Sequence, residues 1–271
     1  MNIAIVYMAA GSSSRFEGKI KQLVKVGPQG ESLIEYSLKQ ALSAGFNKIV
    51  FIVGDKTEKK FKEMFGNNYQ GTPILYAYQK FNPELRDRPW GTSDAICSIK
   101  EIIHCPFVVC NSDDIYGKQA FKILFNHLKE NNTCATIGYK LGKILPEQGE
   151  VNRGIFKTNP DQTIKSITEE YNLSRDNLKS KNLTEESLCS MNIMGFQPKV
   201  LGLLNKKLIK FKEKHQEDRK IECLLPEEIS KLIQEKKISM KLYPTNEQWI
   251  GITNPEDENK IKEILNKKIK K

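Results

Sequence analysis

The chain has 271 residues, of which 39% are hydrophobic and 8% aromatic, so it can bury a substantial core. This composition excludes an intrinsically disordered chain and a small domain held together by disulfides. Its 43 Lys and Arg residues outnumber 33 Asp and Glu residues, and the formal net charge of +10 suits an anionic partner such as nucleic acid, an anionic membrane surface or phosphorylated small molecules.

The cysteines and the N-terminus point to neither a metal framework nor a targeting segment. The six cysteines form no C-x-x-C pair and do not cluster near the three histidines, so we expect them to be buried small hydrophobic residues. The first residues, MNIAIVYMAAGSSSR, lack a basic leader and turn polar after ten residues. They predict neither a signal peptide nor a membrane span, and we expect a cytoplasmic protein.

The first half of the chain alternates strand-like apolar segments with helical segments. Strands are predicted at 3–8, 48–53, 73–79, 106–111 and 133–139. Helices are predicted at 32–44, 56–65, 92–103 and 118–129. This alternation predicts an α/β fold with three layers: a Rossmann-like, mixed and mostly parallel sheet with helices on both faces.

Beyond about residue 140 the pattern loosens. Strands are predicted at 154–158, 164–170, 190–197 and 238–243. Helices are predicted to open at Pro198 and Pro226, and another closes the chain. The polar stretch 172–186 is expected to be an exposed loop. Because no linker divides the chain, a single domain over 1–271 is predicted, with a looser part around 140–200.

The first motif, AAGSSSR at 9–15, directly follows the first predicted strand. Backbone N–H groups of such a loop can approach phosphate oxygens, and the planar fork of Arg15 can bind two of them. Lys21 brings a second positive charge to the same carboxyl edge of the sheet. The spacing is not that of a Walker loop, and an ordinary glycine turn before a solvated basic loop remains the alternative.

Two more motifs follow predicted strands or open predicted helices. In NSDDIYG at 111–117, the carboxylates of Asp113 and Asp114 end a buried strand, where they need water, a cation or a cationic substrate, and hard oxygens suit Mg²⁺. The alternative is an Asp-rich cap or turn. In RDRPWGT at 86–92, Gly91 and Thr92 can face a base or phosphate, and a simple helix N-cap at Thr92 is the alternative.

Taken in order, these motifs resemble the nucleotidyltransferases that make nucleotide-sugars from a nucleoside triphosphate (NTP) and a sugar 1-phosphate. The likeness runs from residue 3 to about 257 and is strongest to bacterial members with Lys-Gln-Leu, Pro-Trp-Gly-Thr and Asp-Asp-x-Tyr-Gly segments. The resemblance implies Mg²⁺ as cofactor, an NTP and a small phosphorylated acceptor as substrates, and neither nucleic acid nor a membrane as partner. A homo-oligomer is left open.

The resemblance also implies a role for each matching position. Nucleotide-binding positions would be Ala10, Gly11, Gln79, Gly91 and Thr92. The reacting phosphates would be held by Arg15 and Lys21, as catalytic residues, and the metal by Asp113 with Asp114 beside it. The acceptor would be contacted by Gly154, Glu169 and Asn192. Glu169 can equally be a plain surface acid on a strand edge.

Two positions depart from the family pattern. Ser13 stands where the first loop usually has a second glycine, and Gly251 stands where a W-x-D-I-G-T-P segment has an aspartate that helps to hold the metal. Asp114, Asn254 or water would then complete the coordination sphere, or metal binding is weaker.

The resemblance implies that an acceptor phosphate oxygen attacks the α-phosphorus in line and pyrophosphate leaves, without a covalent enzyme intermediate. Four alternatives stay open: a cytidylyltransferase acting on a non-sugar phosphate such as phosphocholine, a metal-dependent glycosyltransferase that uses a nucleotide-sugar, a basic module that binds RNA or DNA, and a catalytically silent regulatory descendant. The sequence does not identify the base or the acceptor.

Overall fold

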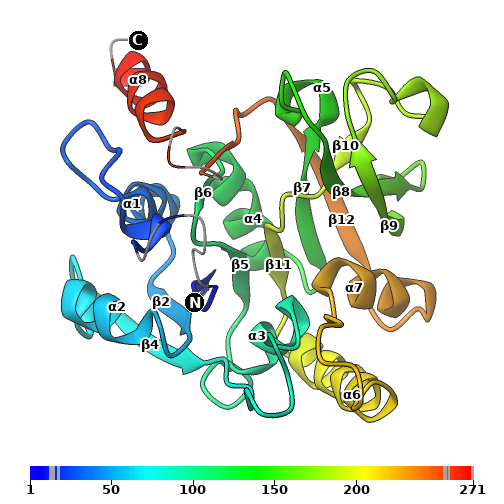
Figure 1. Ribbon diagram of the computed structural model, residues 1–271, viewed down its shortest axis with the longest axis horizontal. Helices are drawn as coiled ribbons and strands as arrows, with labels where there is room; N and C mark the ends of the chain where they lie inside the picture. Colours follow the sequence, from blue (N-terminus) through cyan, green and yellow to red (C-terminus); the bar gives the residue numbers. More distant parts are fainter. Residues whose placement is uncertain (12–15, 17–18, 253–254, 256, 270–271) are drawn as a thin grey trace.

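The computed structural model describes residues 1–11, 16, 19–252, 255 and 257–269, and it describes residues 268 and 269 through their backbone only. The first half of the chain builds the parallel part of a large sheet (Figure 1). Its strands lie in the order β4 (Thr72–Tyr78), β2 (Lys48–Val53), β1 (Ala4–Met8) and β5 (Phe107–Asn111), and each adjacent pair is parallel. Because the strands are parallel, their carboxyl ends meet at one edge of the sheet.

The second half of the chain extends this sheet, mainly through antiparallel pairs. β11 (Met194–Phe196) joins β5 to β7 (Cys134–Lys140), and β12 (Met240–Thr245) lies parallel to β7. Beyond β7 come β10 (Leu188–Cys189) and the hairpin of β8 (Val151–Thr158) and β9 (Ile164–Leu173). The predicted mixed α/β sheet is therefore confirmed, with its longest parallel run in the first half.

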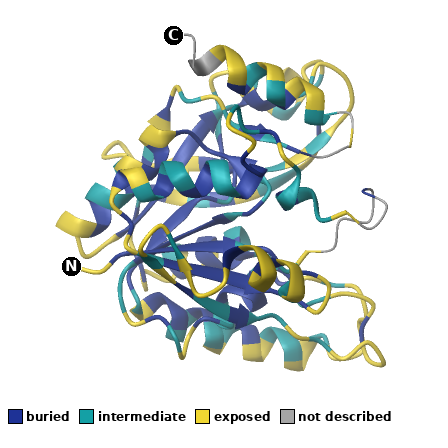
Figure 2. Cartoon of the chain, turned by 90° about the vertical axis from the view of Figure 1, so that its left-hand side faces the viewer, coloured by how far each residue is buried: buried dark blue, intermediate teal, exposed yellow. Residues whose placement is uncertain are grey.

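Helices cover both faces of the sheet, because successive strand residues point to opposite sides. Ile5 and Tyr7 of β1 pack on one face, whereas Ala4 and Val6 pack on the other. The first face is covered by α1 (Leu33–Ala44), α2 (Glu58–Phe65) and α4 (Lys118–Glu130). The second is covered by α3 (Thr92–Cys97), α6 (Lys199–Lys214) and α7 (Leu225–Gln234). Figure 2 shows the buried sheet between helices whose outer sides are exposed, which confirms the three predicted layers.

Helix α1 shows how local sequence fixes an element. The Ser32 hydroxyl accepts a hydrogen bond from the Glu35 backbone N–H at 3.3 Å, and the Glu35 carboxylate accepts one from the Ser32 N–H at 2.9 Å. This capping box begins the helix, and Gly45, with φ of 116°, ends it in the left-handed region that favours glycine. The predicted helix at 32–44 is thereby confirmed.

Two predicted elements are corrected by the structure. The helix predicted at 92–103 ends at Cys97, because Ser98 donates both its N–H and its hydroxyl to the Ala95 carbonyl and tighter turns follow. The strand predicted at 190–197 is shortened to β11 at 194–196, and β10 ends before it at Cys189. Asn192, with φ of 58°, interrupts the extended chain between β10 and β11.

The remaining elements are β3 (Asn68–Tyr69), β6 (Asp114–Ile115), α5 (Leu141–Ile144), β13 (Ile250–Gly251), α8 (Asp257–Ile269) and the 3₁₀ turns Lys21–Leu23 and Lys179–Lys181. β3 pairs with the start of β4, whereas β6 follows the carboxyl end of β5. β13 pairs antiparallel with β6, and a small core ties α8 to this ribbon through Ile115, Ile250 and Leu265. The C-terminal segment is thus packed beside the end of β5. The single-domain organisation over 1–271 stays a prediction.

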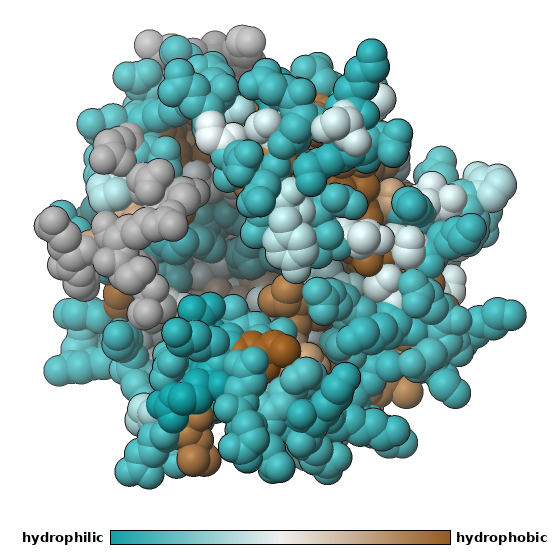
Figure 3. Space-filling model, turned by 45° about the vertical axis from the view of Figure 1, so that its right-hand side comes forward, coloured by the Kyte–Doolittle hydropathy of each residue, from teal (hydrophilic) through white to brown (hydrophobic). Residues whose placement is uncertain are grey.

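No helix in the described ranges has the length and apolar character needed to cross a membrane. The face of the molecule in Figure 3 is mostly hydrophilic and is hollowed near its centre.

Candidate functional site

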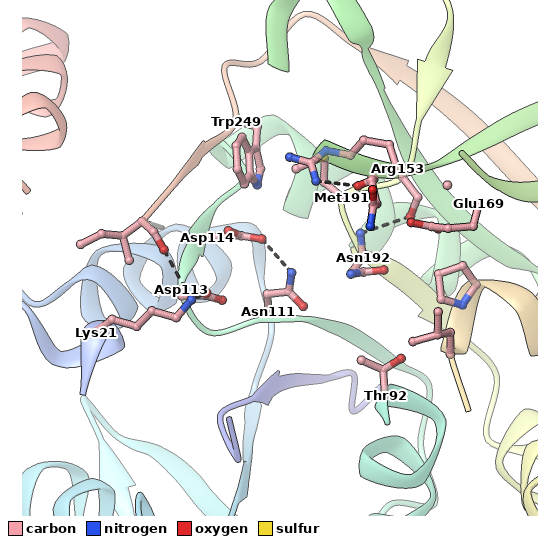
Figure 4. A pocket seen from close by; sticks show the side chains of 16 residues that line it. Lys21, Thr92, Asn111, Asp113, Asp114, Arg153, Glu169, Met191, Asn192 and Trp249 are labelled. Carbon is pink, nitrogen blue, oxygen red and sulfur yellow. Dashed lines mark hydrogen bonds and ion pairs between the residues drawn. The ribbon is translucent and has the colours of Figure 1, made fainter. Parts of the chain in front are cut away.

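Two adjoining cavities lie at the carboxyl edge of the parallel strands. One has a volume of about 250 Å³ and the other about 260 Å³, and both are lined by Thr92 and Asn111. The first, here called the loop cavity, follows β1 and β4. The second, here called the β8 cavity, extends from the end of β5 to the β8–β9 hairpin and is drawn in Figure 4.

The loop cavity gathers all five residues that the resemblance assigns to nucleotide binding. Its lining consists of Met8, Ala10, Gly11, Gln79, Pro89, Gly91, Thr92, Ala95, Asn111 and Glu222. The residues of the first and third sequence motifs therefore meet in space, although some 80 positions separate Gly11 from Gly91. Strand order explains this meeting, since β1 and β4 flank β2 and run in the same direction.

The amide of Gln79 is held in one orientation. Its Nε2 donates to the Gly91 carbonyl at 2.9 Å and to Oδ2 of Asp94 at 3.0 Å, so both amide hydrogens have partners. The buried Asp94 carboxylate is itself paired with Lys212 Nζ at 2.5 Å. A reversed amide would set its oxygen against a carbonyl and a carboxylate, which is strongly unfavourable. Gln79 therefore keeps its side-chain oxygen as the group that can accept a further hydrogen bond.

Gly91 and Thr92 shape the wall between the two cavities. Gly91 has φ of 95°, and a Cβ there would lie 2.8 Å from the backbone oxygen of Cys223, so only glycine fits without strain. The Thr92 hydroxyl accepts a hydrogen bond from the Leu225 N–H at 2.8 Å. Thr92 is the first residue of α3 and ties it to the start of α7, which excludes the alternative that it merely caps its own helix.

The β8 cavity gathers the predicted phosphate, metal and acceptor residues that the structure describes. Its lining includes Lys21, Asp113, Asp114, Gly154, Glu169 and Asn192. Arg15 and Ser13 lie outside the described residues, as does Asn254. Every other predicted site residue lines one of the two cavities.

Lys21 and Asp113 lie in contact in the lining of the β8 cavity. Lys21 Nζ forms an ion pair with the Asp113 carboxylate and lies 3.5 Å from the backbone oxygen of Ile252 (Figure 4). Both side chains remain about a quarter exposed, at 26% and 22%. The pair therefore stays accessible to a ligand that brings its own charges.

Asp114 is much more deeply buried than Asp113. One oxygen, Oδ2, accepts hydrogen bonds from Asn111 Nδ2 at 2.8 Å and from the Tyr116 hydroxyl at 3.1 Å. Burial first, and then repulsion by Asp113, raises the pKa of Asp114 to about 7. The other oxygen, Oδ1, lies 2.7 Å from the place where a Cβ of residue 251 would stand. Asp114 and the Trp249 ring thus fill the space that a side chain at Gly251 would need.

The two aspartates fit a magnesium ion that is completed by its substrate. Their carboxylates supply hard oxygen ligands, and the described residues contain no group of three His, Cys, Asp or Glu side chains that could cage a metal alone. Mg²⁺ commonly takes one or two protein carboxylates together with waters and substrate phosphates. The donor set beside the loop cavity agrees with that pattern.

The far side of the β8 cavity is built by the β8–β9 hairpin and by the break between β10 and β11. Gly154 and Glu169 are direct partners in the hairpin register. Burial raises the pKa of the Glu169 carboxyl, and the nearby charge of Glu227 adds to this effect while Arg153 opposes it. The left-handed turn at Asn192 brings its side chain to the same wall. This placement disfavours Glu169 as an ordinary surface acid.

Sequence reasoning missed several lining residues. Arg153 and Trp249 contribute to the β8 cavity, and Met8 and Glu222 to the loop cavity. Arg153 adjoins the predicted Gly154, and Trp249 lies in the segment that departs from the family pattern at Gly251. Both therefore lie beside residues that the sequence had already indicated. Glu222 does not, because it reaches the cavity through the loop that precedes α7.

Comparison with known families gives one match over nearly the whole chain. The sequence model described as nucleotidyl transferase matches residues 4–257. No curated protein sequence matches the chain closely enough to count as a relative.

Solved structures of similar fold share little sequence with this chain. A protein from Bacillus anthracis assigned as a glucose-1-phosphate thymidylyltransferase has 13% identity and a TM-score of 0.69, covering 97% of this chain and 95% of its own. A UDP-glucose pyrophosphorylase in complex with UDP-glucose has 15% identity and a TM-score of 0.69, with coverages of 99% and 100%. The inositol-1-phosphate CTP transferase from T. maritima has 16% identity and a TM-score of 0.67, with coverages of 98% and 96%. At these identities the matches show a shared fold.

Proposed function

The chain belongs to the nucleotidyl transferase family, and from this premise we propose that it transfers a nucleoside monophosphate from an NTP to a sugar 1-phosphate or a similar phosphate monoester, with release of pyrophosphate. The observation that carries the proposal is the pair of adjoining cavities, which share Thr92 and Asn111. Two substrates bound there would meet at the common wall. Such an arrangement converts an encounter between two repelling anions into a reaction between positioned neighbours.

In this proposal the loop cavity binds the nucleoside. Ala10 and Gly11 offer backbone groups to the nucleotide, and the fixed oxygen of Gln79 accepts a hydrogen bond from the base. Gly91, whose glycine backbone packs closely against Cys223, would form the wall beside the nucleotide. Thr92 then marks the boundary at which the nucleotide's phosphates enter the β8 cavity.

The reacting phosphates would lie near Lys21 and Asp113. Lys21, with Arg15 from the first loop, offsets the negative charge that builds on the α-phosphate and on the leaving pyrophosphate. Asp113, with Asp114 beside it, would hold Mg²⁺, which supplies positive charge to the phosphates when bound. The acceptor would lie toward Gly154, Glu169 and Asn192, where polar groups suit its hydroxyls.

A substrate grid tests this proposal. Each of the common NTPs is combined with a panel of phosphate monoesters, including glucose 1-phosphate, inositol 1-phosphate and phosphocholine, in the presence of Mg²⁺, and pyrophosphate release is measured. The proposal predicts release that depends on both substrates for at least one pair. Release of a free nucleoside diphosphate from a nucleotide-sugar instead, with no reaction from any NTP, would indicate a glycosyltransferase.

A further inference from the structure

Arg153 lines the β8 cavity but has no role among the site residues proposed above. It lies on β8, directly before Gly154, and its guanidinium carbon is 5.7 Å from the centre of the Trp249 ring. One terminal nitrogen, Nη1, donates to the backbone oxygen of Asn152 at 2.8 Å. The Nε atom is buried and has no hydrogen-bond partner among the described residues. A buried donor without a partner is costly unless a ligand satisfies it.

The charges that line the β8 cavity make this guanidinium distinctive. Among the cavity's lining residues the cations are Lys21 and Arg153, and the acids are Asp113, Asp114 and Glu169. Lys21 is in an ion pair with Asp113. Within the described ranges no carboxylate comes close enough to Arg153 to form an ion pair with it. Arg153 is therefore the cation of this cavity whose charge is least neutralised by protein groups.

The position of Arg153 is also informative. In Figure 4 its side chain extends toward Trp249, so the guanidinium lies between the Asp114 side of the cavity and the Glu169 side. The phosphate of an acceptor must occupy the same interval, because it attacks the nucleotide on one side and carries its alcohol moiety on the other. A guanidinium offers a planar set of donors that matches phosphate oxygens, and its contact with an aromatic ring holds that plane.

We propose that Arg153 binds the phosphate group of the acceptor and makes the β8 cavity selective for phosphate monoesters over the corresponding free alcohols. This inference rests on the proposed function for the identity of the acceptor, and it adds a residue that neither the family motifs nor the sequence analysis assigned. Trp249 acts as a positioning residue for the guanidinium, while Glu169 and Asn192 remain for the hydroxyl groups of the acceptor.

The test compares Arg153→Met, which removes the charge, with Arg153→Lys, which keeps the charge but loses the planar fork. Lys157→Met is the matched control, because Lys157 lies on the same strand but is exposed outside both cavities. Wild type and variants are assayed with the active substrate pair from the grid. Arg153→Met should raise the KM for the acceptor by about 10-fold or more, as expected for a lost charge-assisted hydrogen bond. The KM for the NTP should change by less than about threefold, and Arg153→Lys should fall between wild type and Arg153→Met.

A binding measurement separates this inference from the proposed function. Quenching of Trp249 fluorescence, in a Trp90→Phe background, is titrated with glucose 1-phosphate, inositol 1-phosphate and phosphocholine, and with the unphosphorylated parents glucose, inositol and choline. Wild type should prefer at least one phosphate ester over its parent, and Arg153→Met should lose that preference while Lys157→Met keeps it. Equal preference in wild type and Arg153→Met, or no preference in wild type, overturns the inference. Absence of pyrophosphate release from every pair contradicts the proposed function, yet leaves the binding comparison decisive for Arg153.

Discussion

At the scale of single residues, the ion pair of Lys21 and Asp113 is the feature most directly tied to the proposed reaction. Without substrate the two side chains neutralise each other in the lining of the β8 cavity. A bound triphosphate with Mg²⁺ would offer each of them a partner of opposite sign. Each charge is thus compensated before the substrate binds, by the other side chain, and would be compensated afterwards by the substrate and its metal ion.

Replacement of either residue should therefore impair turnover far more than folding. Lys21→Ala and Asp113→Ala are each expected to lower kcat by about 100-fold or more, as when one strong electrostatic donor is lost. Lys25→Ala serves as control, since Lys25 is an exposed cation only four positions away. Steady-state pyrophosphate release measures the effect, and near-normal turnover in either variant would show that the pair has no part in the reaction.

The predicted site residues came together for a simple topological reason. Residues that directly follow parallel strands share one edge of the sheet, so Gly11 and Asp113 could be grouped from sequence patterns alone, whereas Gln79 was expected only from the family resemblance. Glu222 could not be grouped with them, because it reaches the loop cavity from a loop, and Arg153, on an antiparallel strand, is indicated only by its neighbour Gly154. No periodicity or spacing rule relates such residues to the first strands of the sheet.

At the scale of elements, the packing around the short ribbon of β6 and β13 leaves no room for a side chain at Gly251, the position where the family pattern has an aspartate. A Cβ at Gly251 would lie 2.7 Å from Asp114 Oδ1 and would also collide with the Trp249 ring. Even a methyl group must therefore displace Asp114, Trp249 or the ribbon itself.

Gly251→Ala should destabilise the protein by about 1–3 kcal/mol through overpacking, and it should lower turnover by moving Asp114. The matched control is Gly202→Ala in α6, where a Cβ would have no neighbour within 4 Å. That change should instead stabilise the protein by about 0.5–1 kcal/mol, because alanine favours a helix interior over glycine. Urea unfolding measures both variants, and a Gly251→Ala protein as stable and active as wild type would refute the described packing.

The end of α4 contributes a pH-dependent element to stability. His127 Nε2 lies 3.2 Å from the Thr133 carbonyl, so this nitrogen carries the proton, and Nδ1 accepts from the Tyr243 hydroxyl at 3.0 Å. Burial first, and then the nearby charge of Lys241, lowers the pKa of His127, although the Thr133 hydrogen bond and Glu130 oppose the shift. The folded state therefore favours the neutral ring.

Because the folded pKa of His127 lies below its unfolded value of about 6.5, its contribution is fully present above that pH and is lost as the pH falls. Wild type should lose more stability than His127→Gln between about pH 7.5 and about pH 5.5. Urea midpoints at the two pH values measure the difference. A greater loss in the variant would reverse the assigned direction of the shift.

Strands and helices could be predicted where a single pattern, such as an apolar run or a helix cap, dominates the local sequence. The strand at 48–53 coincides with β2, and the capping residues of α1 mark its ends. The strand predicted at 190–197 failed because an apolar run does not reveal that Asn192 adopts a left-handed conformation. The same turn places Asn192 in the β8 cavity, so the local error occurred at a position that builds the candidate site.

At the scale of the whole molecule, the sheet joins two kinds of strand pairing that divide the site between them. The parallel part from β4 to β5 forms the loop cavity and the aspartate pair, and the antiparallel β8–β9 hairpin forms the wall opposite. In the proposed function, the loop cavity would bind the nucleotide and the hairpin side of the β8 cavity would select the acceptor, so the base and the acceptor would be recognised at separate cavities.

The central claim is that the α-phosphorus of an NTP is transferred to a phosphate monoester. Its most direct test supplies the active pair with NTP that is radiolabelled either at the α-phosphorus or at the γ-phosphorus, and separates the products. The account predicts that the α label appears in the nucleotide-acceptor product and the γ label in pyrophosphate. Transfer of the γ label to the acceptor, or release of the α label as a free nucleotide whether or not the acceptor is present, would contradict it.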